Sequence, residues 1–327
     1  MRHVLITGAG GFIGRRLTKT LLARPQLRWR GEDAPIGRLT LVDRHPFPVN
    51  GGTGIETRSI IGDLSDPAFR DSLSLQGAHS IFHLASRLTL EVEQDPDAAY
   101  VADIGTLRGL IGQTSAQPIF VYSSSIAAYG GLPQAVLDEA QAPAPETTYG
   151  THKVVSELLI ADASRHGRID GRSLRLPIVV TRPRAGPGRP AISDLISAAL
   201  REPLEGRDIT LPLKQETIVP LTSVGTVVAA LTALHDAPGA LLPAARAVNL
   251  PSLSVPIQRL AEEARQRATQ PPPRIAFASD RQVQAIVESW PAQLTSRYAE
   301  GLGIRPDLDV AALITDFLSH HGGQSNA

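Results

Sequence analysis

The first residues that could carry out chemistry are a tyrosine and a lysine four positions apart. Tyr149 and Lys153 begin a segment with helical periodicity, over residues 149–165, so their side chains share one face of the predicted helix. A free phenol has a pKa of about 10 and is a poor base at neutral pH, but a neighbouring ammonium group lowers that pKa. Only three of the 32 basic residues are lysines, the others being Lys19 and Lys214, so a lysine at this spacing stands out. The pair predicts a general acid/base.

Three serines are expected to lie near this pair. Ser123, Ser124 and Ser125 come directly after a predicted strand over residues 119–122. The carboxyl ends of parallel strands meet at one edge of a sheet, where α/β proteins bind their ligands. We therefore expect serine hydroxyls beside Tyr149 and Lys153.

A glycine-rich segment near the N-terminus predicts a dinucleotide site. Gly8, Gly11 and Gly14 fall between a predicted strand over residues 3–6 and a predicted helix over residues 12–22. Glycines at this spacing permit a tight turn, a close approach of the backbone to a pyrophosphate, and close packing of the helix on the sheet. The alternative is a plain strand-to-helix turn, but both the spacing and the flanking elements favour the dinucleotide site.

The residue that ends the second predicted strand, over residues 39–42, bears on the choice of cofactor. There the carboxylate of Asp43 would bind the ribose hydroxyls of an adenosine and repel a 2'-phosphate. This favours NAD over NADP, although Arg15, Arg16 and Arg44 could bind a phosphate and weaken that preference.

A second acidic residue follows the next predicted strand, over residues 58–61. In Gly62-Asp63-Leu64, the carboxylate could reach the adenine amino group while Leu64 packs on the ring. The same tripeptide could be a simple turn, but its place at the end of a sheet strand favours a binding role.

The elements that must position these residues alternate between buried strands and amphipathic helices. Further strands are predicted over residues 80–84 and 173–180, and a helix over residues 98–113. This order predicts an α/β protein with a Rossmann-type doubly wound parallel sheet in an NAD-binding domain, residues 1–181. The proline- and glycine-rich residues 182–190 predict a loop into a smaller, mostly helical substrate-binding region, residues 182–327, of which about 214–250 is expected to pack back on the sheet. Helices there are predicted near residues 192–201, 223–235, 256–268, 280–289 and 309–320.

Composition excludes several classes of protein. The 32 basic and 32 acidic residues give a net charge of zero, which argues against nucleic acid as a partner. No apolar run approaches the roughly 20 residues that span a bilayer, and the N-terminus enters a strand pattern directly, so we expect no membrane partner and no signal peptide. The absence of cysteine removes disulfides and thiol catalysis. Cytoplasmic localisation is the default expectation.

Together these motifs resemble the extended short-chain dehydrogenase/reductase family, in its nucleotide-sugar epimerase/dehydratase-like branch. The resemblance covers nearly the whole chain. It rests on the glycine triplet, Asp43, Gly62-Asp63-Leu64, His83-Leu84-Ala85, the serine cluster followed by Tyr129-Gly130, and Tyr149 with Lys153.

The resemblance implies roles for individual residues. Tyr149 would be the catalytic acid/base, Lys153 its partner, and Ser125 the group that hydrogen-bonds the substrate hydroxyl, with Ser124 as the second choice. The implied cofactor-binding residues are Gly8, Gly11, Phe12, Ile13, Gly14, Asp43, Asp63, Leu64, Leu84, Ala85, Ser123, Tyr149, Lys153, Pro177 and Ile178.

Two departures from the branch narrow the function. Nucleotide-sugar enzymes usually carry asparagine where Ile178 stands and arginine where Glu216 stands, and a glutamate would repel a pyrophosphate. Four other stretches resemble the narrower D-erythronate dehydrogenase-like group: residues 170–177, 201–204, 249–255 and 289–291. That resemblance implies an NAD-dependent dehydrogenase that oxidises a small 2-hydroxy sugar acid to the keto acid. The alternatives are a nucleotide-sugar epimerase or dehydratase and a non-catalytic dinucleotide sensor, the latter disfavoured by the presence of both Tyr149 and Lys153.

Other features concern the substrate and the partners. An anionic substrate needs a cation, for which Arg87, Arg182, Arg184 and Lys214 are candidates, each with a solvated surface charge as the alternative.

The family commonly has asparagine at the position of Ala102, where it helps to order a proton-relay water, so the alanine puts that proton relay in doubt. The histidines show no metal-ligand spacing, and no metal is predicted. Relatives often form homodimers through the helices that begin near residues 98 and 149, which predicts a homodimer by analogy.

Overall fold

The structure is a computed structural model that describes residues 1–49, 54–73, 75–87, 89–115, 117–131, 135–181, 192–268 and 272–319. Among these residues, eight strands form the main sheet, in the order β12-β8-β6-β5-β1-β3-β2, with β4 also paired to β3. All pairings in this sheet are parallel except that of β2 with β3. The strands are β1 (Arg2–Thr7), β2 (Gln26–Trp29), β3 (Glu32–Asp43), β4 (Glu56–Ile61), β5 (Ser80–His83), β6 (Ile119–Ser125), β8 (Asp170–Leu176) and β12 (Ala247–Asn249).

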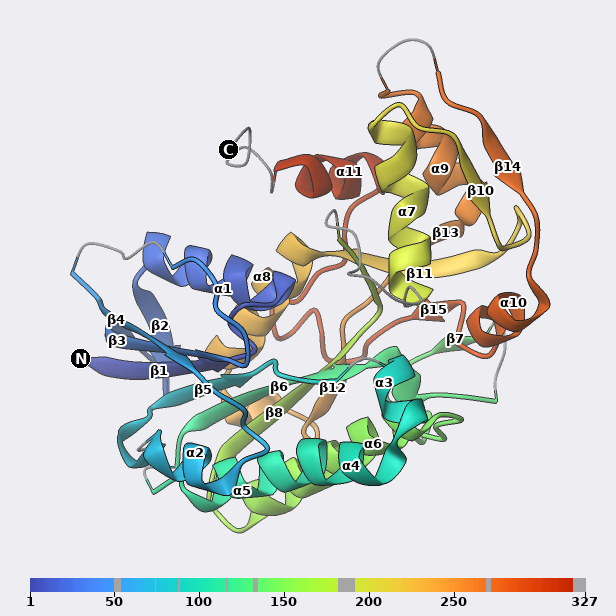
Figure 1. The fold of residues 1–327 in the computed structure, drawn as a ribbon. Helices are drawn as coiled ribbons and strands as arrows, with labels where there is room; N and C mark the ends of the chain where they lie inside the picture. The colour runs from blue at the N-terminus through green and yellow to red at the C-terminus, as the bar shows by residue number, and fades with distance from the viewer. Residues whose placement is uncertain are drawn as a thin grey trace.

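Helices cover both faces of the sheet, which confirms the predicted Rossmann-type doubly wound fold (Figure 1). On one face lie α1 (Phe12–Ala23) and α8 (Val224–Asp236), whose buried side chains join those of the strands in one hydrophobic core. On the other face lie α2 (Pro67–Ser72), α4 (Pro96–Tyr100), α5 (Thr106–Gly112) and α6 (Thr148–Arg165). A π-helical turn, Val101–Gly105, joins α4 to α5, and the short α3 (Thr89–Gln94) precedes them. The continuous burial of β1 and β6 is what a parallel sheet covered on both faces requires.

A second hydrophobic core lies in the C-terminal region, which occupies the upper right of Figure 1. Its helices are α7 (Ile192–Leu204), α9 (Ile257–Arg265), α10 (Arg281–Glu288) and α11 (Val310–Ser319). Its strands form small sheets: β9 (Ile178–Val180) with β11 (Ile218–Ser223) and β13 (Leu253–Pro256), β10 (Ile209–Leu211) with β14 (Ile275–Phe277), and β7 (Val136–Leu137) with β15 (Gln293–Leu294).

Residues from the second half of the chain return to the main sheet. The strand β12 pairs in parallel with β8 and forms one edge of the sheet, while α8 packs on α1 and on the strands. The sequence predicts that some later segments, about residues 214–250, pack in this way.

Two local predictions differ from the structure. The strand predicted over residues 173–180 is divided at Pro177: β8 ends at Leu176, and β9 belongs to a different sheet. Proline has no backbone N–H and cannot continue a ladder of hydrogen bonds inside a sheet. The antiparallel β2, which extends the sheet beside the first part of β3, was not expected.

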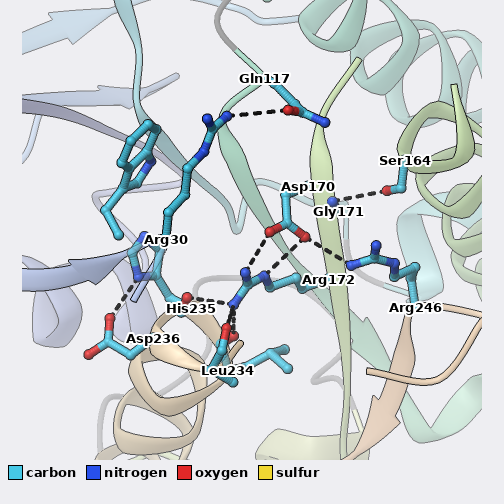
Figure 2. Close-up of polar contacts among 12 residues, drawn as sticks. Arg30, Gln117, Ser164, Asp170, Gly171, Arg172, Leu234, His235, Asp236 and Arg246 are labelled. Carbon is cyan, nitrogen blue, oxygen red and sulfur yellow. Dashed lines mark hydrogen bonds and ion pairs between the residues drawn. The ribbon is translucent and has the colours of Figure 1, made fainter. Parts of the chain in front are cut away.

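A buried arginine fixes the end of α8 to the sheet (Figure 2). Nη1 of Arg172, on β8, donates hydrogen bonds to the main-chain carbonyls of Leu234 and His235, each at 2.6 Å, and Nη2 bonds the Asp170 carboxylate at 2.6 Å. Arg246, just before β12, binds the other oxygen of Asp170 at 2.9 Å. The carbonyls at the end of a helix lack partners within the helix, so Arg172 satisfies groups that burial would otherwise leave unpaired.

Candidate active site

A cleft of about 460 Å³ opens at the carboxyl ends of β1, β3, β4, β5 and β6. It brings together ten of the predicted site residues: Gly8, Gly11, Asp43, Asp63, Leu64, Leu84, Ala85, Arg87, Tyr149 and Lys153. The lining does not include Phe12, Ile13, Gly14, Ser123, Ser124, Ser125, Pro177 or Ile178. Arg182 and Arg184 lie outside the described residues. Lys214 lies elsewhere, with Nζ 3.8 Å from a carboxylate oxygen of Glu288.

The glycine-rich turn needs glycine for physical reasons. Gly8 has a φ of 70°, in the left-handed region, and a Cβ at this position would lie 2.6 Å from the backbone nitrogen of Ala85. A Cβ on Gly14 would lie 2.2 Å from the carbonyl oxygen of Gly8. The turn is therefore packed against the loop after β5 and against the start of α1, and it presents bare backbone to the cleft, as a bound pyrophosphate requires.

Asp43 ends β3 directly beside this turn. Its carboxylate accepts hydrogen bonds from the backbone N–H groups of Gly10, at 2.9 Å, and His45, at 3.1 Å. These bonds hold the carboxylate at the mouth of the cleft, where its remaining lone pairs can accept from ribose hydroxyls. Arg15 and Arg44 also line this part of the cleft, whereas Arg16 turns away to Asp316, at 3.5 Å.

The loop after β4 is held by its own side chains. The Asp63 carboxylate accepts from the backbone N–H of Ser65 at 2.8 Å and from its hydroxyl at 2.7 Å. The backbone bond is the largest cause that lowers the pKa of Asp63, so this carboxyl remains ionised. The carbonyl of Leu64 accepts from Arg70 at 2.6 Å and from Thr106 at 3.0 Å, which fixes the loop as one wall of the cleft.

Two contacts position the start of α6. The hydroxyl of Thr147 caps the helix by accepting from the N–H of Gly150 at 3.0 Å. The carboxylate of Glu93, on α3, accepts from the N–H of Tyr149 and from the hydroxyl of Thr148, both at 3.1 Å. The tyrosine is therefore fixed to the cleft wall through its backbone, while its side chain lines the cleft.

Lys153 is buried beside the two tyrosines. Only 3% of its surface is exposed, Nζ donates to the carbonyl of Ser123 at 2.8 Å, and it lies 4.8 Å from the ring centre of Tyr122 and 5.3 Å from that of Tyr149. Burial lowers the pKa of Lys153, but Tyr122, Tyr149 and the carboxylate of Asp103 together raise it by more, so the net direction is upward. The side chain is therefore an ammonium at neutral pH, as the predicted mechanism needs.

His83 lies behind this group and is uncharged. Its Nδ1 is 2.7 Å from the hydroxyl of Thr7, and its ring stacks on that of Tyr122. Burial, together with the charge of Lys153, lowers the pKa of His83 to about 3. An imidazole that stays neutral here avoids a second positive charge next to the ammonium.

Because His83 is buried as a neutral imidazole, we expect the free energy of unfolding to decrease as the pH falls. Between its unfolded pKa of about 6.5 and its folded pKa of about 3, only the unfolded state binds the proton, so stability is lost as the pH falls, by up to about 1.4 kcal/mol per pH unit. In His83→Asn, which keeps a polar group near Thr7, we expect the unfolding free energy to fall less steeply between pH 6.5 and 4.5. Urea denaturation of both proteins at several pH values measures this difference, and parallel curves would contradict it.

The three serines face different surroundings. Ser123 is buried and supplies its carbonyl to Lys153, while Ser124 is buried and donates to Glu157 at 2.5 Å. Ser125 is partly exposed at the end of β6, and its Oγ accepts from the N–H of Ala127 at 3.1 Å. Since the Oγ of Ser125 acts there as an acceptor, its hydroxyl proton is available to another group.

A buried ionic network lies beneath the serines. Arg175, on β8, makes two bonds to the carboxylate of Glu157, on α6, at 2.9 and 2.6 Å, and donates to the hydroxyl of Tyr129 at 2.6 Å. That hydroxyl in turn bonds Asn249, at the end of β12, at 3.1 Å. The network ties the helix that carries Tyr149 to three strands of the sheet.

Asp103 and His152 are two of several cleft residues that were not predicted. Asp103, in the π-helical turn, and His152, beside Lys153, line the cleft and contact each other, with 3.2 Å between Oδ2 and Nδ1. The signal that could have found His152 is its place one turn after Tyr149 in the predicted helix. The signal for Asp103 is weak, because the π-helical turn that presents it was not predictable.

The fold and the cleft define a class of protein. A doubly wound sheet with a bare glycine turn, an acid at the end of β3, and a tyrosine beside a buried ammonium is the arrangement of a dinucleotide-dependent oxidoreductase. The NAD dependent epimerase/dehydratase family matches residues 4–249, and the chain belongs to this family. Its cofactor is NAD, which the residues at Gly8 and Asp43 suit.

Comparison with known proteins gives several full-length similarities. The chain is 35% identical to a D-erythronate dehydrogenase of Cupriavidus necator, over 98% of this chain and 99% of that protein. It is 34% identical to a D-erythronate dehydrogenase of Haemophilus influenzae, over 97% of this chain and 99% of that protein. Among solved structures, a nucleoside-diphosphate-sugar epimerase from Agrobacterium tumefaciens superposes with a TM-score of 0.87 at 27% identity, over 99% of this chain and 95% of that one.

Within the described residues, no helix is long and apolar enough to cross a membrane, and no cluster of three metal-ligating side chains occurs.

Proposed function

We propose that this protein is a cytoplasmic NAD-dependent dehydrogenase that oxidises the hydroxyl of a small 2-hydroxy sugar acid, similar to D-erythronate, to the keto acid. The observation that carries the proposal is the intact pair of Tyr149 and buried Lys153 in the cleft of the glycine turn. The full-length similarity to two D-erythronate dehydrogenases supports the choice of substrate class.

In the proposed reaction, each of these residues has its own role. Tyr149, as a phenolate stabilised by the ammonium of Lys153, takes the proton of the substrate hydroxyl. Ser125 donates a hydrogen bond to the same substrate oxygen, since its Oγ already accepts from Ala127. Gly8, Asp43, Asp63 and Leu64 hold the dinucleotide, and bound NAD supplies the hydride acceptor.

Arg87 is the proposed anchor for the substrate carboxylate. It lines the cleft just after Leu84 and Ala85, on the loop that follows β5, and is partly buried. A guanidinium group can bind a carboxylate with two parallel hydrogen bonds, which gives both charge and orientation. Arg182 and Arg184 remain further candidates from the sequence.

Oxidation of four- to six-carbon aldonates tests both the activity and the anchor. We expect NADH to form with at least one aldonate, and Arg87→Met to raise its KM at least about tenfold because a charge-assisted contact is lost. Arg44→Met, which removes a different cleft arginine, serves as the matched variant and should leave the aldonate KM nearly unchanged. An unchanged KM in Arg87→Met would reject the anchor, while the absence of NADH with every aldonate would reject the proposed reaction.

A nucleotide-sugar epimerase is the second candidate, favoured by the close superposition on the Agrobacterium tumefaciens protein. The same assay separates the two, because an epimerase converts a nucleotide sugar with no net NADH. A protein that binds NAD tightly but turns over neither substrate class would be a sensor.

We also propose a homodimer through α4, α5 and α6. The surface of these helices and of the π-helical turn between α4 and α5 exposes apolar side chains, with Tyr100 at 52%, Val101 at 63% and Leu158 at 65%, and a second copy would cover them. Sedimentation should give twice the chain mass of 34.8 kDa, and Leu158→Glu should give the monomer. A wild-type monomer would contradict the proposal.

A further inference from the structure

Oxidation of a hydroxyl leaves a proton in the cleft, a step that rests on the proposed function. The substrate's C–H bond breaks with its electron pair going to NAD as hydride, the O–H proton passes to Tyr149, and the balance is hydroxy acid plus NAD⁺ giving keto acid, NADH and H⁺. Tyr149 must lose this proton before the next turnover. The question is which groups take it to water.

The side of the cleft nearest the sheet offers the proton no route to water. Lys153 is 3% exposed, donates to a main-chain carbonyl and is flanked by the rings of Tyr122 and Tyr149. Behind it, His83 is buried, and burial holds its pKa at about 3, so it does not accept a proton at neutral pH. The proton taken up by Tyr149 therefore has to leave along another wall.

The wall formed by α6 and the π-helical turn contains a pair of groups suited to carry a proton. His152 and Asp103 are 3.2 Å apart, line the same cleft as Tyr149 and Lys153, and have side chains that are only 7% and 16% exposed. Asp103 is also one of the charges that raise the pKa of Lys153, so the pair is electrostatically coupled to the ammonium.

The pair also borders the open cleft, through which it can reach water. The ring of Tyr100 packs edge-on against His152 with 5.7 Å between ring centres, which holds the imidazole at the cleft wall. In the π-helical turn, Ala102 lines the cleft without a polar side chain, whereas the next residue, Asp103, presents a carboxylate. Single π-helical turns are frequent at functional sites because they present side chains that a regular helix would not.

We propose that Asp103 and His152 form a proton-release pair, which accepts the substrate proton from Tyr149 and passes it to water while Lys153 stays an ammonium. The pair acts through these residues and does not touch the substrate. The other titratable or charged groups that line this cleft near the pair are Glu91, Arg87, Tyr122, His83, Tyr149 and Lys153.

Rapid mixing of enzyme, NAD and the best aldonate of the panel tests the proposal, with NADH absorbance and a pH indicator followed together. In the wild type, proton release should keep pace with NADH. In His152→Gln and in Asp103→Asn, the first turnover of NADH should persist, proton release should lag behind it, and steady-state turnover should fall at least about tenfold. Added imidazole should restore turnover, because a small base can take the proton directly.

Glu91→Gln is the matched control, since it removes another carboxylate of the same cleft. It should leave turnover nearly unchanged and show no response to imidazole. If both pair variants release protons together with NADH and do not respond to imidazole, the pair is only structural and the proposal is wrong. The two variants act independently, so one that fails to fold leaves the other to decide. A wild-type enzyme that forms no NADH would reject the proposed function instead.

Discussion

Tyr149→Phe is expected to lower turnover of the aldonate by about 10³-fold while leaving the affinity for NAD within about twofold, because it removes one general base and no group that faces the cofactor's charge. The phenylalanine ring fills the same space, and the contact of α6 with Glu93 is made by the backbone N–H of residue 149, which the substitution keeps. Steady-state NADH formation measures the first effect, and calorimetric titration with NAD measures the second.

The matched control for this variant is Tyr122→Phe. Tyr122 also lines the cleft and lies even nearer to Lys153, but burial raises the pKa of its phenol, which makes it a poor base. We expect Tyr122→Phe to retain turnover within about tenfold, the effect of one hydrogen bond. Equal losses in the two variants, or turnover that survives in Tyr149→Phe, would show that the base has been assigned to the wrong tyrosine.

Glu157→Leu is expected to lower the free energy of unfolding by about 3–5 kcal/mol, because it leaves the guanidinium of Arg175 buried without its counter-charge. Both side chains of this pair are 5% exposed. The hydroxyl of Ser124 loses its acceptor as well. Urea denaturation, with the midpoint and slope fitted for each protein, measures the loss.

The double variant Glu157→Leu/Arg175→Met separates the charge from the packing. Replacement of both charges by apolar groups of similar volume should recover most of the lost stability, because no unpaired charge remains. Glu157→Leu with the stability of the wild type would mean that water reaches Arg175. A double variant no more stable than Glu157→Leu would mean that packing, rather than the buried charge, explains the loss.

Much of the fold was predictable because its signals are local. The run of four buried residues in β1, the glycine turn and the periodicity of α1 and α6 follow from short stretches of sequence, and the structure has all four at the predicted places. The unexpected strand β2 carries apolar Leu27 and Trp29 in alternation. The turn between β2 and β3 has Arg30 at a φ of 52° and Gly31 at a φ of 89°. Asn-Gly or Asp-Gly is the usual dipeptide in a hairpin turn of this kind, so Arg-Gly does not indicate it.

The candidate site was predictable where its residues come from known motifs and not where they depend on distant partners. Asp43, Asp63, Tyr149 and Lys153 reach one cleft because parallel strands end at one edge of the sheet. The bond between Ser124 and Glu157 depends on how α6 lies over β6, a matter of tertiary packing that no local pattern reports. The same holds for Asp103 and His152, which meet only because the π-helical turn passes beside α6.

The position of β12 has a consequence for the order of events during synthesis. The N-terminal half carries the whole glycine turn and the tyrosine–lysine pair, yet among the described residues the edge of β8 pairs with residues 247–249 of β12. Until these residues leave the ribosome, the nascent chain exposes an unpaired strand edge, and the phenol of Tyr129 lacks its bond to Asn249. Contacts between residues so far apart in sequence close late. The half of the chain that holds the glycine turn and the tyrosine–lysine pair therefore completes its sheet only after residues 247–249 have been made.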